Sequence, residues 1–91
     1  MVTKPFIFEG SRLILNFSSS GAGSIRVEIQ NQSGIPTDGY SISECLELFG
    51  DDLERPVLWK NGGDVSALSG TPIRLRFVIR DADLYSLRFV E

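Results

Sequence analysis

The residues of this chain that could do chemistry are its clustered acids. Asp51, Asp52 and Glu54 form one cluster, and Asp81 and Asp83 form another. Glycoside hydrolysis needs two carboxyl groups about 5–5.5 Å or about 6.5–9.5 Å apart across a cleft, and Ca²⁺ needs about six to eight oxygen ligands. Both clusters lie in predicted turns, where acidic residues are common for local reasons, and neither matches a calcium-loop consensus. We therefore predict a chain without catalytic residues, without a metal site and without a cofactor.

A second chemistry is sugar binding, which uses an exposed aromatic ring beside carboxylate or amide groups. The candidate residues for such a site are Trp59, Tyr40, Asp81 and Asp83. The competing interpretation for Trp59 is a place in the core, because it shares a strand face with Val57. Tyr40 follows a turn, and we expect it to be more exposed than the other aromatic candidates, Trp59 and Tyr85.

The composition excludes several other classes of function. The chain has no histidine, which is the usual general base near neutral pH and the commonest zinc ligand. Its net charge of −3 disfavours a nucleic-acid partner. Cys45 is the single cysteine, so a disulfide within the chain is excluded, and its apolar neighbours favour burial. No apolar run approaches the ~20 residues of a membrane span, so we expect no membrane partner.

Strand-like alternation must position these side chains. Apolar and polar residues alternate over 12–17, 24–30 and 72–80, which is typical of half-buried strands, and turn signals separate these segments. Only 41–54 has roughly helical spacing, and it predicts one short helical turn at most. We therefore predict a single all-β domain over residues 1–91. Its expected architecture is an antiparallel β-sandwich of about seven or eight strands, with jelly-roll or immunoglobulin-like topology.

The end of the chain is predicted to form a hairpin with a loop at 81–83. This register pairs Ile79 with Tyr85 and Phe77 with Leu87, so every inward partner is apolar or aromatic. It also predicts that Phe77 lies at the centre of the core.

The same hairpin places Arg76 opposite Arg88, and facing like charges cost a few tenths to ~1 kcal/mol. We expect solvation, or a carboxylate such as Glu28 on a neighbouring strand, to offset this repulsion. The alternative is a bound anion or acidic sugar between the arginines.

Three stretches that together span nearly the whole chain suggest a family. They read TKPFIFEG, GSRLILNFSSSGAGSIRVEIQ and DLERPVLWKNGGDVSALSGTPIRLRFVIRDADLYSLRF, and the most specific part runs from Trp59 to Phe89. The chain resembles the C-terminal β-sandwich module of large bacterial proteins. The upstream part of those proteins looks like a five-bladed β-propeller glycoside hydrolase of the sucrose- and fructan-cleaving type.

This resemblance implies a module excised from a longer chain and packed on, or tethered to, an upstream catalytic-type domain. It also implies an extracellular or periplasmic location, and it transfers no site residue. We therefore expect a non-catalytic accessory or interaction module of a glycoside hydrolase-like protein, and not an enzyme. The alternative is a stand-alone carbohydrate-binding module whose partner is a glycan. That alternative requires Trp59 or a tyrosine to be largely exposed.

Overall fold

The computed structural model describes residues 1–50 and 54–91. Three strands form one antiparallel sheet in the order β2-β1-β3. β1 spans Arg12–Asn31, β2 spans Asp51–Pro56 and β3 spans Ile73–Val90. Helical structure in the described residues is limited to two short 3₁₀ turns, η1 at Ile42–Glu44 and η2 at Ser66–Leu68. The all-β class is confirmed, and η1 lies where the helical turn was predicted.

The alternation of apolar residues produces the predicted inward faces. Ile25, Val27 and Ile29 are fully buried in β1, and Phe77 is buried in β3. These side chains belong to one cluster, because successive strand residues point to opposite faces and one set turns inward. The buried apolar residues are Phe8, Leu13, Leu15, Phe17, Ile25, Val27, Ile29, Cys45, Leu48, Val57, Trp59, Val65, Ile73, Leu75 and Phe77.

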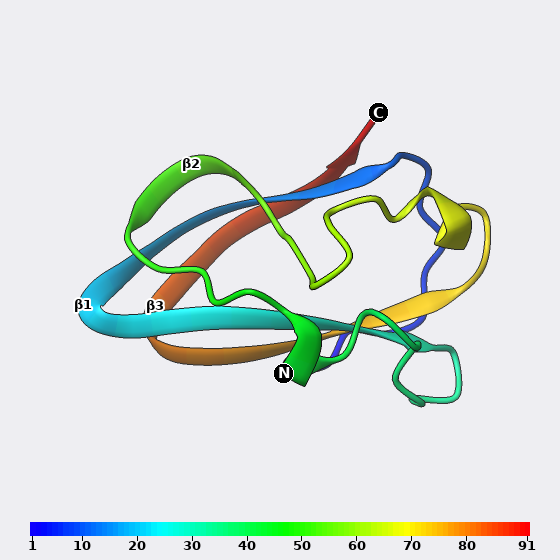
Figure 1. Cartoon of the computed structure of the whole chain (residues 1–91), viewed down its shortest axis with the longest axis horizontal. Coiled ribbons are helices and arrows are strands. Elements are labelled where there is room, and N and C mark those ends of the chain that lie inside the picture. The colour runs from blue at the N-terminus through cyan, green and yellow to red at the C-terminus, as the bar shows by residue number, and fades with distance from the viewer.

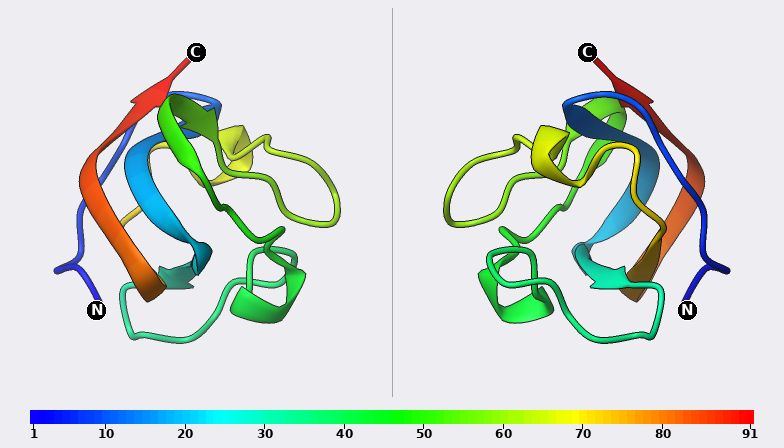
Figure 2. Two further views of the ribbon diagram at one scale, coloured as in Figure 1. Left: turned by 90° about the vertical axis from the view of Figure 1, so that its left-hand side faces the viewer. Right: turned by 90° about the vertical axis from the view of Figure 1, so that its right-hand side faces the viewer.

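The prediction of seven or eight strands is wrong, because long bent strands replace several expected short ones. β1 and β3 pair along nearly their whole length, from Arg12 opposite Val90 to Asn31 opposite Ile73. Both strands turn back at the same end of the molecule (Figure 1), and their halves curve around a shared interior (Figure 2). Neither a jelly roll nor an immunoglobulin-like sandwich can be built from three strands.

The glycine-rich run at 18–23 was expected to be a turn between strands, but it is a bend within β1. The pairing moves from Ser19 opposite Ala82 to Ser24 opposite Arg80, so several β1 residues lie across from Asp81 alone. A side-chain carbon on Gly23 would lie 2.3 Å from the Asp81 carbonyl oxygen. Gly23 therefore permits the backbones of β1 and β3 to approach closely. A glycine in a turn between two strands looks the same in the sequence, so the sequence could not show which of the two structures forms.

The predicted hairpin around 81–83 is also wrong. Asp81 adopts a positive φ of 45° and bends β3 without ending it. Phe77 lies opposite Val27, not Leu87, and Ile79 lies opposite Ile25. β1 is long enough to pair with both halves of β3. The backbone N–H and C=O groups of the two halves therefore bond to β1, whereas in a hairpin the two halves would have bonded to each other.

The wrong hairpin register also led to a wrong prediction for the Tyr85 side chain. Asn16 pairs with Ser86 and Phe17 with Leu84, which leaves Tyr85 as the extra residue of a β-bulge. A bulge changes the face to which the following side chains point. Tyr85 is consequently 63% exposed, where the hairpin predicted burial.

The edges of the long pair are covered by irregular segments. The N-terminal residues run along β3, where Val2 bridges Arg76 and Phe6 bridges Ile73. Segment 36–48 runs along β1, where Leu48 bridges Ile25. Within the part of the chain that the structure describes, no helix is long and apolar enough to cross a membrane.

Candidate functional site

The structure divides the four residues that the sequence offered as a sugar site into two pairs that lie apart. Trp59 is only 1% exposed, and its indole N–H donates to the Val27 carbonyl at 3.0 Å, so the core interpretation is confirmed. Tyr40 is half-buried and packs edge-on against Trp59, with ring centroids 5.3 Å apart. The prediction that Tyr40 is the most exposed aromatic candidate is wrong, because Tyr85 is 63% exposed. Asp81 and Asp83 are exposed near the bend of β3, at the end of the molecule away from the turn that precedes Tyr40 (Figure 1).

The acidic clusters form no site in the described residues. Asp51 and Asp52 lie outside them, and Glu54 makes an ion pair with Arg88. Across residues 1–50 and 54–91, no group of three or more Cys, Asp or Glu side chains could hold a metal ion.

A polar groove surrounds the loop that follows Trp59. Two hollows of about 600 Å³ and about 200 Å³ share Asn61, Gly62 and Asp64, and we name them together the 61–64 groove. The larger hollow is also lined by Arg12, Pro56, Leu58 and Ser66, and the smaller by Asp38 and Tyr40. Most of these lining residues are exposed, so the groove is open to solvent.

The 61–64 loop is fixed from several sides. The backbone N–H groups of Trp59 and Gly62 donate to each other's carbonyl oxygens at 2.9 and 2.8 Å, which closes a tight turn. Gly62 has a φ of 103°, a conformation that side chains other than glycine rarely adopt. Beyond the loop, the Val65 N–H donates to the Ser11 carbonyl at 2.8 Å. Because Trp59 is anchored in the core, the loop has a rigid base.

Asp64 interacts electrostatically with two other groove residues, Arg12 and Tyr40. Hydrogen bonds from the Ser66 side chain and then the Ser66 backbone lower the pKa of Asp64, and the positive charge of Arg12 adds to this. The Tyr40 hydroxyl donates to the Asp64 carbonyl oxygen at 2.8 Å. Partial burial, and secondarily the Asp64 charge, raise the pKa of Tyr40. The groove therefore presents an ionised carboxylate beside a neutral phenol.

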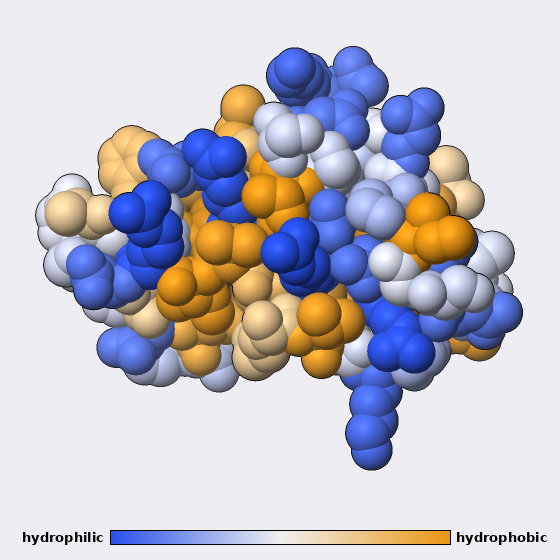
Figure 3. Space-filling model, turned by 90° about the horizontal axis from the view of Figure 1, so that it is seen from below, coloured by the Kyte–Doolittle hydropathy of each residue, from blue (hydrophilic) through white to orange (hydrophobic). Residues whose placement is uncertain are grey.

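Apolar side chains gather on another surface, the lower face. It comprises four adjacent segments: 46–49, the second half of β1, the first half of β3 and the N-terminal residues. Leu46 and Phe49 are 51% and 58% exposed on the first segment, and Val2 is exposed on the last. Figure 3 shows hydrophobic residues over the middle of the molecule as seen from below, interrupted by hydrophilic ones.

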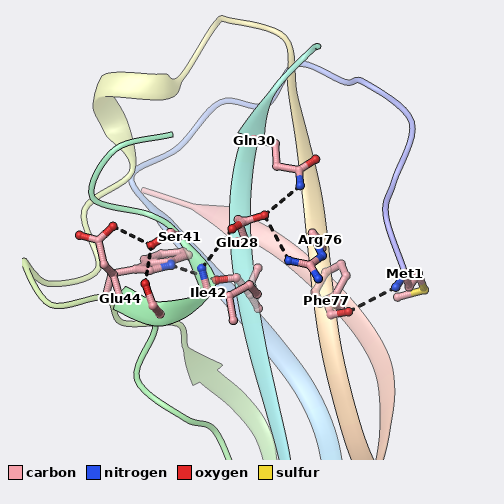
Figure 4. A network of polar contacts seen from close by, with 11 residues as sticks. Met1, Glu28, Gln30, Ser41, Ile42, Glu44, Arg76 and Phe77 are labelled. Carbon is pink, nitrogen blue, oxygen red and sulfur yellow. Dashed lines mark hydrogen bonds and ion pairs between the residues drawn. The ribbon is translucent and has the colours of Figure 1, made fainter. Parts of the chain in front are cut away.

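A buried carboxylate, that of Glu28 on β1, is the centre of a network of polar contacts (Figure 4). Glu28 is 4% exposed; one of its oxygens accepts the Ile42 N–H at 3.2 Å, and the other accepts the Gln30 side-chain amide at 2.8 Å. Arg76 approaches Glu28 at 3.7 Å from the opposite position of β3. Glu28 is thus the predicted partner of Arg76, but the prediction that Arg76 faces Arg88 is wrong.

The same network holds η1 against β1. Glu44 accepts the Ser41 hydroxyl at 2.7 Å and the Gly39 N–H at 3.2 Å. The Ser41 side-chain bond is the largest cause that lowers the pKa of Glu44, with backbone bonds and Lys60 contributing. Glu28 is buried although alternation assigned its face of β1 to solvent, because Ile42, Gln30 and Arg76 contact its carboxylate.

Arg12, Asn61 and Asp64 were not predicted as site residues from the sequence. Asn61 and Asp64 lie in a glycine-containing turn, and these residue types are common in turns whether or not they bind anything. Arg12 is the first residue of β1, far away in the sequence. Only the fold brings the three together.

Comparison of the chain with protein-family models, with curated proteins and with solved structures found no match.

Proposed function

We propose that this chain is a non-catalytic accessory module of a glycoside hydrolase-like protein, which packs against the catalytic-type domain of that protein. The single observation that carries the proposal is the lower face. Leu46 and Phe49 stay largely exposed on the 46–49 segment that borders this face, although the chain has a buried core of its own. Exposed apolar groups that gather on one face favour a protein contact.

A binding measurement tests this role. The chain is mixed with a separately produced five-bladed propeller domain of a sucrose- or fructan-cleaving enzyme, and complex formation is followed by analytical ultracentrifugation. We expect a complex that Leu46→Ser and Phe49→Ser weaken by about tenfold or more, because each removes buried apolar contact.

Ile35→Ser is the matched control, because Ile35 is 60% exposed but lies in the turn beyond β1. The proposal fails if no complex forms, or if Ile35→Ser weakens the complex as much as Phe49→Ser does.

A carbohydrate-binding module is the second candidate, and the exposure of Tyr85 favours it. The earlier requirement was a largely exposed tryptophan or tyrosine. Trp59 does not meet it, whereas Tyr85 does, and Asp83 is exposed two residues away on the same strand. Loss of glycan retention on an affinity gel in Tyr85→Ala, with no loss in Ile35→Ser, would support this candidate.

A further inference from the structure

The 61–64 groove has the size of a ligand site. Its larger hollow, of about 600 Å³, falls within the range of about 300–1,000 Å³ that is usual for small-molecule sites. The smaller hollow extends it past the loop, because Asn61, Gly62 and Asp64 line both. A side-chain carbon on Gly39 would lie 3.9 Å from the Asn61 amide nitrogen, which places this amide near the smaller hollow. An elongated ligand could therefore contact both hollows.

The polar groups of the groove match hydroxyl groups. The Asp64 carboxylate accepts hydrogen bonds, the Arg12 guanidinium donates them, and the Asn61 amide does both. A pair of neighbouring hydroxyls also donates and accepts, so it can bond to several of these groups at once. Pro56 and Leu58 add apolar surface, which suits the C–H groups of a sugar ring.

The charges of the groove select against ionic ligands. Arg12 is the cationic side chain that lines it, and Asp38 and Asp64 are the acidic ones. An anionic ligand would meet an excess of negative charge. A cationic ligand would meet Arg12 next to Asp64. A neutral ligand avoids both costs.

Asp64 is already held in place without a ligand. Its carboxylate accepts the Ser66 N–H at 2.9 Å, and its carbonyl accepts the Tyr40 hydroxyl at 2.8 Å. A group that is ordered in advance loses little conformational freedom on binding, so more of the interaction energy appears as affinity.

We propose that the 61–64 groove binds a neutral carbohydrate through Arg12, Asn61 and Asp64. The site uses polar side chains over a small apolar surface and does not depend on an exposed aromatic ring. Its three binding residues belong neither to the lower face nor to the Tyr85 site, so the proposal does not rest on the accessory role.

An NMR titration of the whole ¹⁵N-labelled chain tests the site. The probes are neutral fructo-, xylo-, manno- and cello-oligosaccharides, with a sulfated oligosaccharide as the anionic comparison. At least one neutral probe is expected to shift the amide signals of Gly62 and Gly63, and the sulfated one to leave them unchanged. Asp64→Asn and Asn61→Ala should each raise the Kd about tenfold or more, because each removes a hydrogen-bonding group.

Glu47→Gln is the matched control and should bind as the unaltered chain does, because Glu47 is an exposed carboxylate that pairs with Arg26 and does not line the groove. Asn61→Ala keeps the test valid if Asp64→Asn disturbs the loop, because Asn61 is exposed on its turn. The proposal is overturned if no neutral probe binds, or if both groove variants bind normally. It is also overturned if Tyr85→Ala alone abolishes binding, a result that would support the second candidate instead. Complex formation with the propeller domain is measured separately, so the two proposals can fail independently.

Discussion

At the scale of single residues, Phe77 and Arg76 are neighbours in β3 with opposite surroundings. Phe77 is buried, and truncation to Ala should cost ~3–5 kcal/mol through lost burial and the cavity left behind. Folded domains commonly have only ~5–15 kcal/mol in total, so Phe77→Ala should be marginal or unfolded. Urea denaturation followed by circular dichroism measures this loss, and a variant with unchanged stability would show that Phe77 is not in the core.

Arg76→Ala is expected to destabilise the protein modestly, by roughly 1 kcal/mol. Arg76 is partly exposed but provides the positive charge beside buried Glu28, which keeps its bonds to Gln30 and Ile42 in the variant. The facing-arginine register predicted little cost or even a gain in stability. A measured gain in the same denaturation experiment would favour that register over the Glu28–Arg76 pair.

The buried thiol of Cys45 is expected to make the free energy of unfolding decrease as the pH becomes alkaline. Burial is the main cause that raises the pKa of its thiol; a hydrogen bond from the Val27 N–H and the charge of Arg26 oppose this only partly. The folded state therefore holds the thiol proton more tightly than the unfolded state. This contribution is complete below the ordinary thiol pKa of about 8.5 and is lost as the pH rises through the higher folded value.

Thermal melts between about pH 7 and about pH 10 should accordingly show a smaller alkaline decrease in Tm for Cys45→Ser than for the unaltered chain. Alkylation of Cys45 by iodoacetamide should also be slow in the folded protein and fast in urea. Equal alkaline decreases in Tm for the two proteins would show that the thiol is not protected.

At the scale of elements, the bend shared by β1 and β3 depends on Gly23. A side-chain carbon there would lie 2.3 Å from the Asp81 carbonyl oxygen and 2.7 Å from that of Arg80, and backbone atoms cannot move aside cheaply. Gly23→Ala should therefore cost ~1–3 kcal/mol. Gly21→Ala is the control, because nothing lies within 4 Å of the added carbon, and its stability should be unchanged or slightly higher. Urea midpoints of the two variants compare them, and equal midpoints would contradict this account of the bend.

This bend also shows how far the fold could be predicted from the sequence. Which residues face the core follows from local alternation, and Ile25, Val27 and Ile29 lie inside as predicted. Which segments pair depends on contacts across the chain, so a glycine-rich bend and a three-residue loop look alike in sequence. The bulge at Tyr85 has no sequence signal at all, because it is set by the register with β1. The groove was unpredictable for the same reason, since Arg12 and Asp64 meet only through the fold.

At the scale of the whole molecule, Trp59 links parts of the chain that are far apart in sequence. Its indole N–H donates to Val27 of β1, its ring packs against Tyr40, and its backbone bridges Cys45. The buried apolar residues form one cluster that includes Trp59. Since Trp59 is the single tryptophan, its fluorescence reports on the state of this shared core.

One core predicts one cooperative transition. Trp59 fluorescence and far-ultraviolet circular dichroism should change at the same urea concentration, because the strands and the tryptophan environment are lost together. The emission should shift to longer wavelength as water reaches the indole ring.

Tyr40→Phe is a useful comparison. It removes the hydroxyl bond to Asp64 but leaves the ring contact, so it should lower the common midpoint without separating the two signals. If the fluorescence changed first and the strand signal persisted, the 61–64 loop and its neighbours would unfold independently of the β1–β3 pair. Trp59 could then not belong to the same cooperative core as the long strands.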